Sequence, residues 1–316
     1  MTALVGNASS REKMESWPAG RPVDSRPGSS TSVAKPTVSV VIPALNESKN
    51  LDWVAANMPS GVHEIILVDG HSTDGTPDVA RSLWPDVRVM SQTRRGKGNA
   101  LACGFFAATS DIIVMLDADG SMDPGEIPNF IAALCEGAEY AKGSRFTDGG
   151  GSSDITTVRT FGNRVFNTLT NVLHGSTFSD LCYGYNAFWR NILPALRLDP
   201  GTQDESDQYS WGDGFEIETL MNIRAHRAGL RIREVPSYEW ARRHGRSNLN
   251  ARTDGLRVLR TIALEWARAP KSVVLDYSAE GPLRDTSDGA AVQVLPTAAR
   301  RQRHVAVSAL RYETRA

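Results

Sequence analysis

The sequence predicts an α/β fold with a mostly parallel central sheet flanked by helices on both faces. Short β-branched apolar runs alternate with amphipathic segments from about residue 36 to residue 145, which is the pattern of successive βαβ units. The chain has 316 residues and is 41% hydrophobic, so it can bury a full core. Polar residues follow several of the apolar runs directly, and parallel sheets bind ligands at the carboxyl ends of their strands.

The first unit begins with a strand at 38–42 (VSVVI), which Pro43 closes. Apolar residues at positions i, i+3, i+4 and i+7 then predict one face of a helix over 46–58. The second strand is expected at 64–68 (EIILV), and it runs into Asp69. The order strand, helix, strand predicts that the two strands pair in parallel.

The next units follow the same order. Thr76 is expected to cap a helix in which Pro77 is the first residue. A third strand is expected at 87–90, a small-residue helix at 98–108 and a fourth strand at 111–116. A helix at 124–135 and a strand at 140–142 then complete this half of the chain.

After residue 150 the alternation changes, and we interpret this region as the second half of the same domain, completing the sheet. The elements expected there are helices at 158–173, 215–228 and 250–267, a strand–turn region at 178–188 and a strand at 232–238. The domain is therefore expected to span residues 36–270. Residues 1–35, rich in Ser, Gly, Pro and Arg, predict a disordered leader, and residues 271–316 predict a flexible tail.

Composition excludes several classes of protein. Lys and Arg total 35 against 36 Asp and Glu, whereas a protein that binds nucleic acid through its overall charge would be clearly basic. The apolar runs are too short to cross a bilayer, and the amino terminus does not resemble a secretory signal. Three cysteines without close pairing argue against a disulfide framework or a zinc cage. We therefore expect a cytoplasmic protein.

The strongest chemical signal is Asp117-Ala118-Asp119, directly after the strand DIIVML. Carboxylates at i and i+2 of an extended segment point the same way. Hard oxygen ligands at a strand end suit Mg²⁺ or Mn²⁺, which completes its coordination with phosphate oxygens. The alternative for the tripeptide alone is a solvated Asp-rich turn.

Three further segments carry polar groups to the ends of strands. In PALNE, Glu47 could bind a nucleobase or ribose, although Asn46 and Glu47 also fit a helix start. In VDGHSTDGT, Asp69 is placed to bind base or ribose. RRGKGN, which contains Lys97, lacks the spacing of a P-loop. It is better interpreted as a glycine-rich helix start that approaches a diphosphate.

In this order and spacing, VSVVIPALNES, ILVDGHSTDGT, RGKGNAL and LDADG resemble the GT-A fold of the family 2 inverting glycosyltransferases. GSR at 143–145, FGNRVFNTLTNVLHG, SDLCYGYNAFWR, GFEIETLM and RRHGRSNLN extend the resemblance to about residue 265. The longer pattern is similar to the branch of dolichol-phosphate and polyprenyl-phosphate sugar synthases. The resemblance implies a nucleotide-sugar donor, a divalent metal and inversion at the anomeric carbon.

The resemblance also implies roles for individual residues. The residues expected to bind the donor are Pro43, Leu45, Glu47, Asp69, Lys97, Asp117, Ala118, Asp119 and Arg145. Asp117 and Asp119 would hold the metal, with Asp119 its direct ligand. Arg145 would contact phosphate, and Arg242 would meet the diphosphate or the acceptor phosphate.

Two acceptors stay open. A polyprenyl phosphate is already ionised and needs no general base, whereas a hydroxyl of a saccharide or small molecule does. Asp213 and Glu216 are the candidates for that base, and Glu216 with Asn248 favours the hydroxyl. A helix start is the structural alternative for Glu216. Ten arginines between residues 224 and 260 favour a lipid phosphate or peripheral contact with the cytoplasmic membrane face. A nucleotide-sugar-binding protein without turnover is the alternative from another class.

Overall fold

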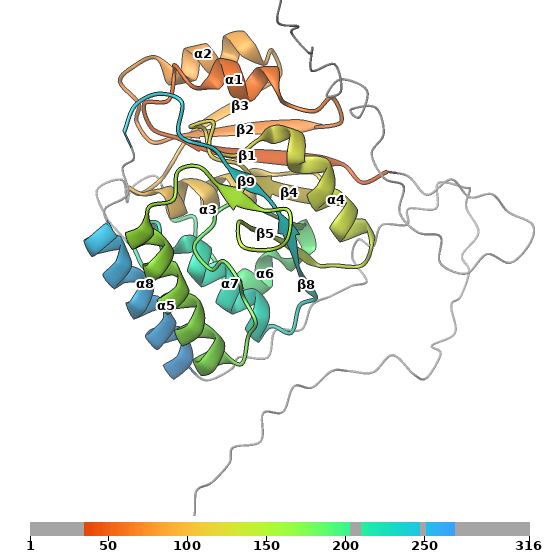
Figure 1. The fold of residues 1–316 in the computed structure, drawn as a ribbon. Coiled ribbons are helices and arrows are strands. Elements are labelled where there is room, and N and C mark those ends of the chain that lie inside the picture. Colours follow the sequence, from red (N-terminus) through yellow and green to blue (C-terminus); the bar gives the residue numbers. More distant parts are fainter. Residues whose placement is uncertain (1–34, 203–209, 247–250, 269–316) are drawn as a thin grey trace, which may run out of the picture.

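The computed structural model describes residues 35–202, 210–246 and 251–268, which form an α/β domain (Figure 1). The strands of its main sheet are β1 (Val38–Ala44), β2 (Glu64–Asp69), β3 (Arg88–Ser91), β4 (Ile112–Met115), β5 (Tyr140–Ser144), β7 (Asn186–Trp189) and β8 (Ile232–Pro236). Their order across the sheet is β3-β2-β1-β4-β7-β5-β8. The predicted fold class and the completion of the sheet by the second half are confirmed.

All described pairings in this sheet are parallel except those of β7, which runs antiparallel to both β4 and β5. Met115 at the end of β4 pairs with Asn186 at the start of β7. A small second sheet joins β6 (Gly151–Ser152) to β9 (Tyr238–Glu239). The antiparallel strand was not predicted, because its direction depends on a long connection rather than on its own sequence.

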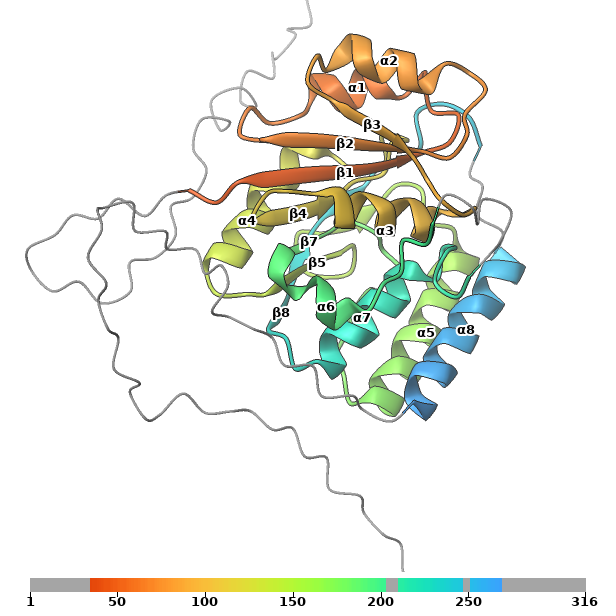
Figure 2. The ribbon, with the colours of Figure 1, turned by 180° about the vertical axis from the view of Figure 1, so that it is seen from behind.

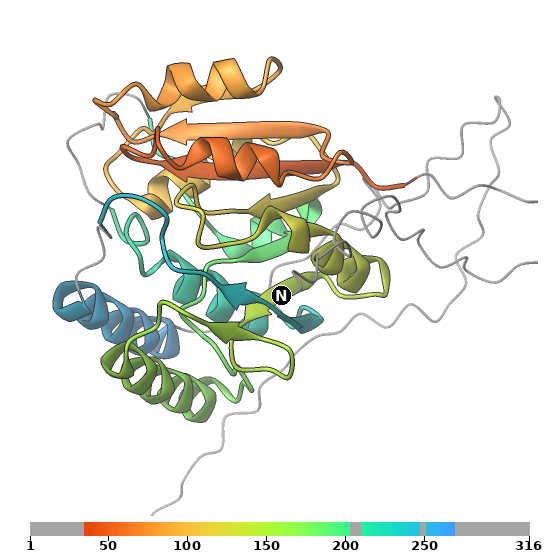
Figure 3. The ribbon, with the colours of Figure 1, turned by 45° about the horizontal axis from the view of Figure 1, so that its top comes forward.

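Helices cover both faces of the sheet. One face carries α1 (Leu51–Ala56), α2 (Thr76–Leu83) and α4 (Ile127–Cys135). The opposite face, seen in Figure 2, carries α3 (Lys97–Ala107), α6 (Leu193–Leu196) and α7 (Ile217–Arg227). Beyond α7, α5 (Thr157–His174) and α8 (Ala251–Ala267) lie side by side as an outer layer (Figure 3).

The core follows from the period of the strands. In β1, Val38, Val40 and Ile42 face α1, α2 and α4, whereas Val41 faces α3 and α7. All four side chains are fully buried. Burial on both faces explains why the strand is a continuous apolar run rather than an alternating one. The apolar run ends with β1 at Ala44, and the polar loop that follows lies at that edge of the sheet.

Three local predictions need correction. β1 continues through Pro43 to Ala44. Proline is tolerated because β4 pairs with β1 only as far as Val41, so no ladder bond requires the missing N–H. The first helix begins at Leu51, not at 46, because Asn46 has a φ of +59° and its Oδ1 accepts a bond from the Thr73 N–H.

The second helix also differs in its cap. Its N-cap is Gly75, with a φ of +81°, and Thr76 is the first helical residue. The hydroxyl of Thr76 accepts a hydrogen bond from the Glu47 N–H and donates one to Asp74. These bonds fasten the two loops that follow β1 and β2 to each other. The threonine therefore holds loops at the site instead of capping a helix.

The predicted leader at 1–35 and tail at 271–316 lie almost wholly outside the described residues, as does Asn248. None of the described helices combines the length and the apolar character needed to cross a membrane.

Candidate active site

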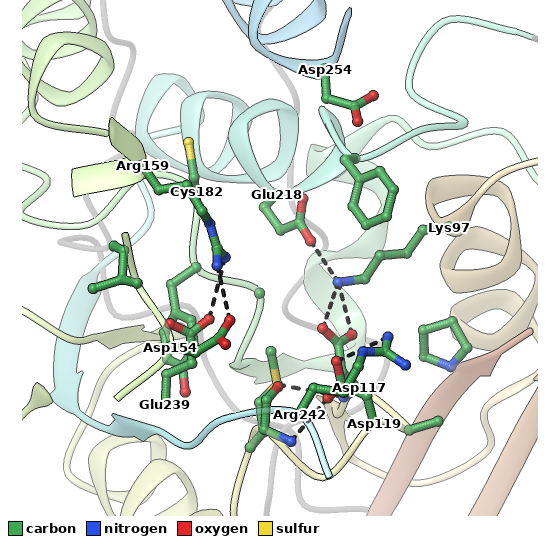
Figure 4. A pocket seen from close by; sticks show the side chains of 18 of the residues that line it. Lys97, Asp117, Asp119, Asp154, Arg159, Cys182, Glu218, Glu239, Arg242 and Asp254 are labelled. Carbon is green, nitrogen blue, oxygen red and sulfur yellow. Dashed lines mark hydrogen bonds and ion pairs between the residues drawn. The ribbon is translucent and has the colours of Figure 1, made fainter. Parts of the chain in front are cut away.

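A cavity of about 710 Å³ opens at the carboxyl ends of β1, β2 and β4 and extends to the first turns of α5 and α8 (Figure 4). The predicted residues that line it are Pro43, Leu45, Glu47, Lys97, Asp117, Ala118, Asp119, Arg145 and Arg242. They come from segments that are far apart in the sequence, as the rule for ligands of parallel sheets predicts. Their roles toward a ligand stay predictions.

Lys97 joins two carboxylates in this cavity. Its Nζ lies 2.8 Å from Asp117 Oδ2 and 2.9 Å from Glu218 Oε1. Burial by itself would lower the pKa of Lys97, but the two carboxylates outweigh it and raise that pKa above its ordinary value. Burial raises the pKa of Asp117 and that of Glu218, although the ammonium opposes both shifts. The cation thus allows a buried acid, Glu218, and a half-buried one, Asp117, to face each other.

Arg242 neutralises the second aspartate. Its Nη2 lies 3.2 Å from Asp119 Oδ2, and its Nη1 lies 2.8 Å from Glu47 Oε1. Burial raises the pKa of Glu47, and the arginine partly offsets the shift. The Asp119 Oδ1 accepts a bond from the Ser121 N–H, which fixes the orientation of the carboxylate. Arg242 therefore connects Glu47, in the loop after β1, to the aspartate pair.

The glycine-rich segment serves packing as well as ligand approach. A Cβ on Gly96 would lie 2.1 Å from the carbonyl oxygen of Asp213, and one on Gly98 would lie 1.9 Å from that of Gly212. The Gly98 N–H donates to the Asp213 carbonyl over 2.7 Å. This N–H is therefore already bonded within the protein. From this segment the Lys97 side chain, and not that N–H, is what reaches the centre of the cavity.

Asp213 does not line the cavity, contrary to its prediction as a general base. It is 2% exposed, and both of its carboxylate oxygens accept bonds from Arg94, over 2.8 and 3.0 Å. The ion pair holds the start of α3 against the loop before α7. The structure thus assigns Asp213 a structural position.

Glu216 is also placed outside the cavity lining. It is fully buried as the N-cap of α7, and its Oε1 accepts bonds from the N–H groups of Gly212 and Gly214. Of the two interpretations of Glu216, this position matches the acid at a helix start and not the general base. The carboxylate that reaches the cavity from this segment is Glu218, on the first turn of α7. Sequence reasoning missed it, because the phase of the helix decides which acid points inward.

Arg145 lines the cavity, but its guanidinium is held by acids. Nε and Nη2 donate to Asp180 over 2.7 and 2.8 Å, and Nη1 donates to Glu239 over 2.9 Å. Burial would raise the pKa of Asp180, but Arg145 outweighs it and keeps that pKa below its ordinary value. The predicted phosphate contact would have to compete with these bonds, so the structure favours a supporting role for Arg145.

Asp69, at the end of β2, was expected to bind base or ribose. It is 7% exposed and does not line the cavity. Its carboxylate accepts a bond from the Ser72 N–H, over 3.1 Å to Oδ2. It therefore shapes the loop after β2. The polar side chain that lines the cavity beside it is Gln92, directly after β3, which the sequence interpretation overlooked.

The far end of the cavity has an apolar wall, with one basic side chain and the acids Asp154, Glu239 and Asp254 at its edge. Ile155, Val158 and Phe166 from α5 and its approach line it together with Val258 from α8. Arg159, on the first turn of α5, also lines the cavity; its Nη1 lies 3.0 Å from Asp154.

The residues fit a divalent metal held jointly with its ligand. Among the described residues no group of three or more His, Cys, Asp or Glu forms a metal cage. Asp117 and Asp119 offer two carboxylates in the cavity, which is the number of protein ligands that Mg²⁺ commonly takes when phosphates supply the rest. The pair thus suits a metal that arrives with a diphosphate.

The arginine-rich stretch at 224–260 does not form one basic face in the described part of the chain. Arg224 is buried against Glu265, and Arg233 pairs with Glu136 at the other end of the sheet. Arg260 lies over the ring of Trp211. Since these charges are dispersed and paired, the residues of this stretch that the structure describes do not form the expected membrane patch.

Comparison with known proteins agrees with the geometry. The model of "Glycosyl transferase family 2" matches residues 39–197. An undecaprenyl-phosphate mannosyltransferase of Micrococcus luteus is 31% identical over 67% of this chain and 87% of its own. A polyprenol monophosphomannose synthase of Mycolicibacterium smegmatis is 32% identical over 66% of this chain and 80% of its own.

A solved structure shows the same fold. Glucosyl-3-phosphoglycerate synthase from Mycobacterium tuberculosis, in complex with Mn²⁺, UDP and glucosyl-3-phosphoglycerate, superposes with a TM-score of 0.55. It is 24% identical, and the match covers 78% of this chain and 88% of that one. The GT-A architecture expected from the sequence is thereby confirmed. Family match and fold together show that the chain belongs to glycosyl transferase family 2 and is a glycosyltransferase.

Proposed function

We propose that this glycosyltransferase moves a hexose from a nucleotide sugar to a polyprenyl phosphate, with inversion and with Mg²⁺ or Mn²⁺. The observation that carries the proposal is the continuity of one cavity. It joins the carboxylates of Asp117 and Asp119 to an apolar wall on α5 and α8. The names of the two mannosyltransferase relatives support the same acceptor class.

On the donor side, Asp117 and Asp119 would hold the metal together with the diphosphate. A divalent ion bound there supplies Lewis-acid stabilisation of the leaving group. Lys97 places a further positive charge beside Asp117, where negative charge accumulates as the bond to the sugar breaks. Arg242 links Asp119 to Glu47 and so aligns the metal site with the nucleoside loop. UDP in the structural relative supports a nucleotide donor without fixing its base here.

On the acceptor side, we assign the phosphate to Arg159. Its guanidinium pairs with Asp154 and, over 3.7 Å, with Glu239, but it is about one third exposed at the cavity edge, whereas that of Arg145 is enclosed by its acids. A phosphate oxygen is ionised at neutral pH and attacks without a general base. We propose that the oxygen approaches from this end, on the side of the sugar opposite the diphosphate, as inversion requires.

An exposed apolar stripe on α5 supports contact with a lipid surface. Val158, Phe161, Val165 and Val172 are all exposed on this helix, and Phe161 reaches 70%. Val158 also lines the cavity, so the stripe continues from the acceptor end. We propose that this face, rather than the arginine-rich stretch, rests on the membrane. The three cysteines are free thiols, which fits a cytoplasmic location.

The second candidate is transfer to a hydroxyl of a saccharide or a small molecule. Glu218 favours it, because this carboxylate lines the cavity and could accept the proton of a hydroxyl. Its bond to Lys97 opposes such a role, since an ion-paired carboxylate is a weaker base.

The test is release of nucleoside diphosphate from UDP- and GDP-sugars with Mn²⁺, with and without undecaprenyl phosphate. We expect release that requires the lipid. Arg159→Gln should raise the KM for the lipid at least tenfold, whereas Glu218→Gln, which keeps an acceptor for Lys97, should retain transfer. Transfer to an alkyl glucoside that Glu218→Gln abolishes would establish the hydroxyl acceptor instead. Donor binding without turnover on any acceptor would indicate a binding protein.

A further inference from the structure

Gln92 occupies the nucleoside end of the cavity. It follows β3 directly, and its N–H donates to the Asp69 carbonyl over 3.1 Å, which sets it beside the loop after β2. Gln92 and Gly70 both line the cavity. A Cβ on Gly70 would lie 3.3 Å from the Cβ of Leu45, so the loops after β1 and β2 are in contact here. The polar amide thus borders the part of the cavity where the loops after three parallel strands meet.

The side chain of Gln92 differs from buried amides such as Asn99 and Asn167. Asn99 accepts bonds from the N–H groups of Thr93 and Arg94, and Asn167 accepts one from Leu181. These amides hold backbone groups, which is the usual structural use of a buried amide. The Gln92 side chain makes no hydrogen bond to the described residues, and although the residue is only 9% exposed, its amide atoms are not sealed from solvent. Because Gln92 lines the cavity, its amide is available to hydrogen-bond a ligand that enters there.

We infer that Gln92 determines donor specificity by reading the base of the nucleotide sugar. The inference rests on the proposed donor site and goes beyond it, because that proposal leaves the base open. A carboxamide offers one acceptor and two donors in a plane. It can therefore pair side by side with an edge that presents a donor next to an acceptor, such as N3–H and O4 of uracil or N1–H and O6 of guanine.

Conversion of the amide to a carboxylate distinguishes the two bases. Glutamate at residue 92 would have the shape of Gln92 but would only accept hydrogen bonds. Guanine presents two adjacent donors, N1–H and N2–H, which suit a carboxylate. Uracil presents one donor between two carbonyl oxygens, and one of them would face the carboxylate. Gln92→Glu should therefore favour guanine over uracil.

The experiment measures the affinities of UDP, GDP and inorganic pyrophosphate with Mn²⁺ by calorimetry. We expect Gln92→Ala to weaken the preferred nucleoside diphosphate about three- to tenfold, as for loss of one or two neutral hydrogen bonds. Pyrophosphate has no base, so its affinity should stay within twofold. In Gln92→Glu the ratio of GDP to UDP affinity should rise at least tenfold. The control is Asn57→Ala, which removes an amide that bonds the Trp53 carbonyl outside the cavity lining.

Each contrary result has its own meaning. Equal losses for pyrophosphate and nucleotide in Gln92→Ala would overturn the inference, because they indicate a structural role. An unchanged ratio of GDP to UDP affinity in Gln92→Glu would overturn it as well. Wild-type protein that binds no nucleoside diphosphate would instead reject the proposed donor site, which keeps the two failures distinct.

Discussion

The ammonium of Lys97 lies 2.8 Å from each carboxylate oxygen of Asp117. The same nitrogen contacts Glu218, so one cation stands between the end of β4 and the first turn of α7. Without this cation, Asp117 and Glu218 would lie close together with no positive charge between them, which is unfavourable when both are ionised. The lysine thus connects the proposed donor half of the site to the proposed acceptor half.

Lys97→Met should therefore reduce both stability and activity. We expect a loss of about 3 kcal/mol in the free energy of unfolding, because buried Glu218 and half-buried Asp117 lose their shared counter-ion. The transfer rate should fall about 100-fold through loss of charge beside the diphosphate. Lys97→Met combined with Glu218→Gln should regain part of the stability and none of the rate. Urea unfolding and steady-state kinetics measure the two effects, and a fully additive double mutant would contradict the coupling.

Asp119→Asn should remove metal-dependent transfer. Asparagine keeps the size of the side chain but loses the charge that would hold the metal, so the rate should fall at least about 100-fold. Mn²⁺ binding in the presence of nucleoside diphosphate, measured by calorimetry, should weaken in parallel. Asp123→Asn is the control, because that acid caps the turn Pro124–Glu126 in the same loop and does not line the cavity. Equal Mn²⁺ affinity in both variants would exclude Asp119 as a ligand.

The ion pair of Asp180 with Arg145 should make stability depend on pH. Because the folded state lowers the pKa of Asp180, the pair stabilises the protein above the ordinary value of 3.8, and the contribution is lost as the pH falls through the lower folded value. Asp180→Asn should cost roughly 3 kcal/mol in the free energy of unfolding at pH 7, since it leaves a buried arginine partly unpaired.

This difference between wild type and Asp180→Asn should shrink below about pH 4. Denaturant unfolding at pH 7 and pH 3.5 measures it. Asp78→Asn, at an exposed pair with Arg81, is the matched control and should change little at either pH. A difference that stays constant over this range would show that the charge of Asp180 is not what stabilises the fold.

The apolar stripe on α5 should bind lipid. Phe161→Asp should weaken sedimentation with phosphatidylglycerol vesicles roughly tenfold, since it removes one large apolar side chain from the contact. Phe106→Asp on α3 is the control, because Phe106 is also exposed, at 53%, but lies on another helix. Equal effects of the two variants would indicate general loss of apolar surface instead of a specific face.

The parts of the site that follow strands could be predicted from the sequence. Asp117 and Asp119 come directly after β4, and the loop with Leu45 comes directly after β1. For such residues, strand order alone decides position, because the carboxyl ends of parallel strands meet at one edge. The apolar period that locates the strands therefore also locates these side chains.

The parts of the site that depend on the rotation of a helix, or on which residues form an ion pair, could not be predicted from the sequence. Glu216 and Glu218 are two residues apart at the start of α7, and two residues turn a helix by about 200°. A shift of the helix start by one residue changes which acid reaches the cavity. Arg145 was predicted at the right place, but its acidic partners lie 35 and 94 positions away in the sequence. No local sequence pattern predicts an ion pair between residues so far apart.

The reversed direction of β7 determines which segments of the chain line the proposed binding regions for the donor and the acceptor. Because Asn186 begins β7 beside the end of β4, the residues that precede the strand arrive at the binding edge. Tyr183 and Gly184 accordingly line the cavity. A Cβ on Gly184 would lie 3.0 Å from Glu218 and 3.2 Å from Lys97. The proposed donor residues thus lie in segments that follow strands, whereas Tyr183 and Gly184 lie in the segment that precedes β7. A longer or shorter segment before β7 would change the depth of the proposed acceptor end and leave the aspartates in place.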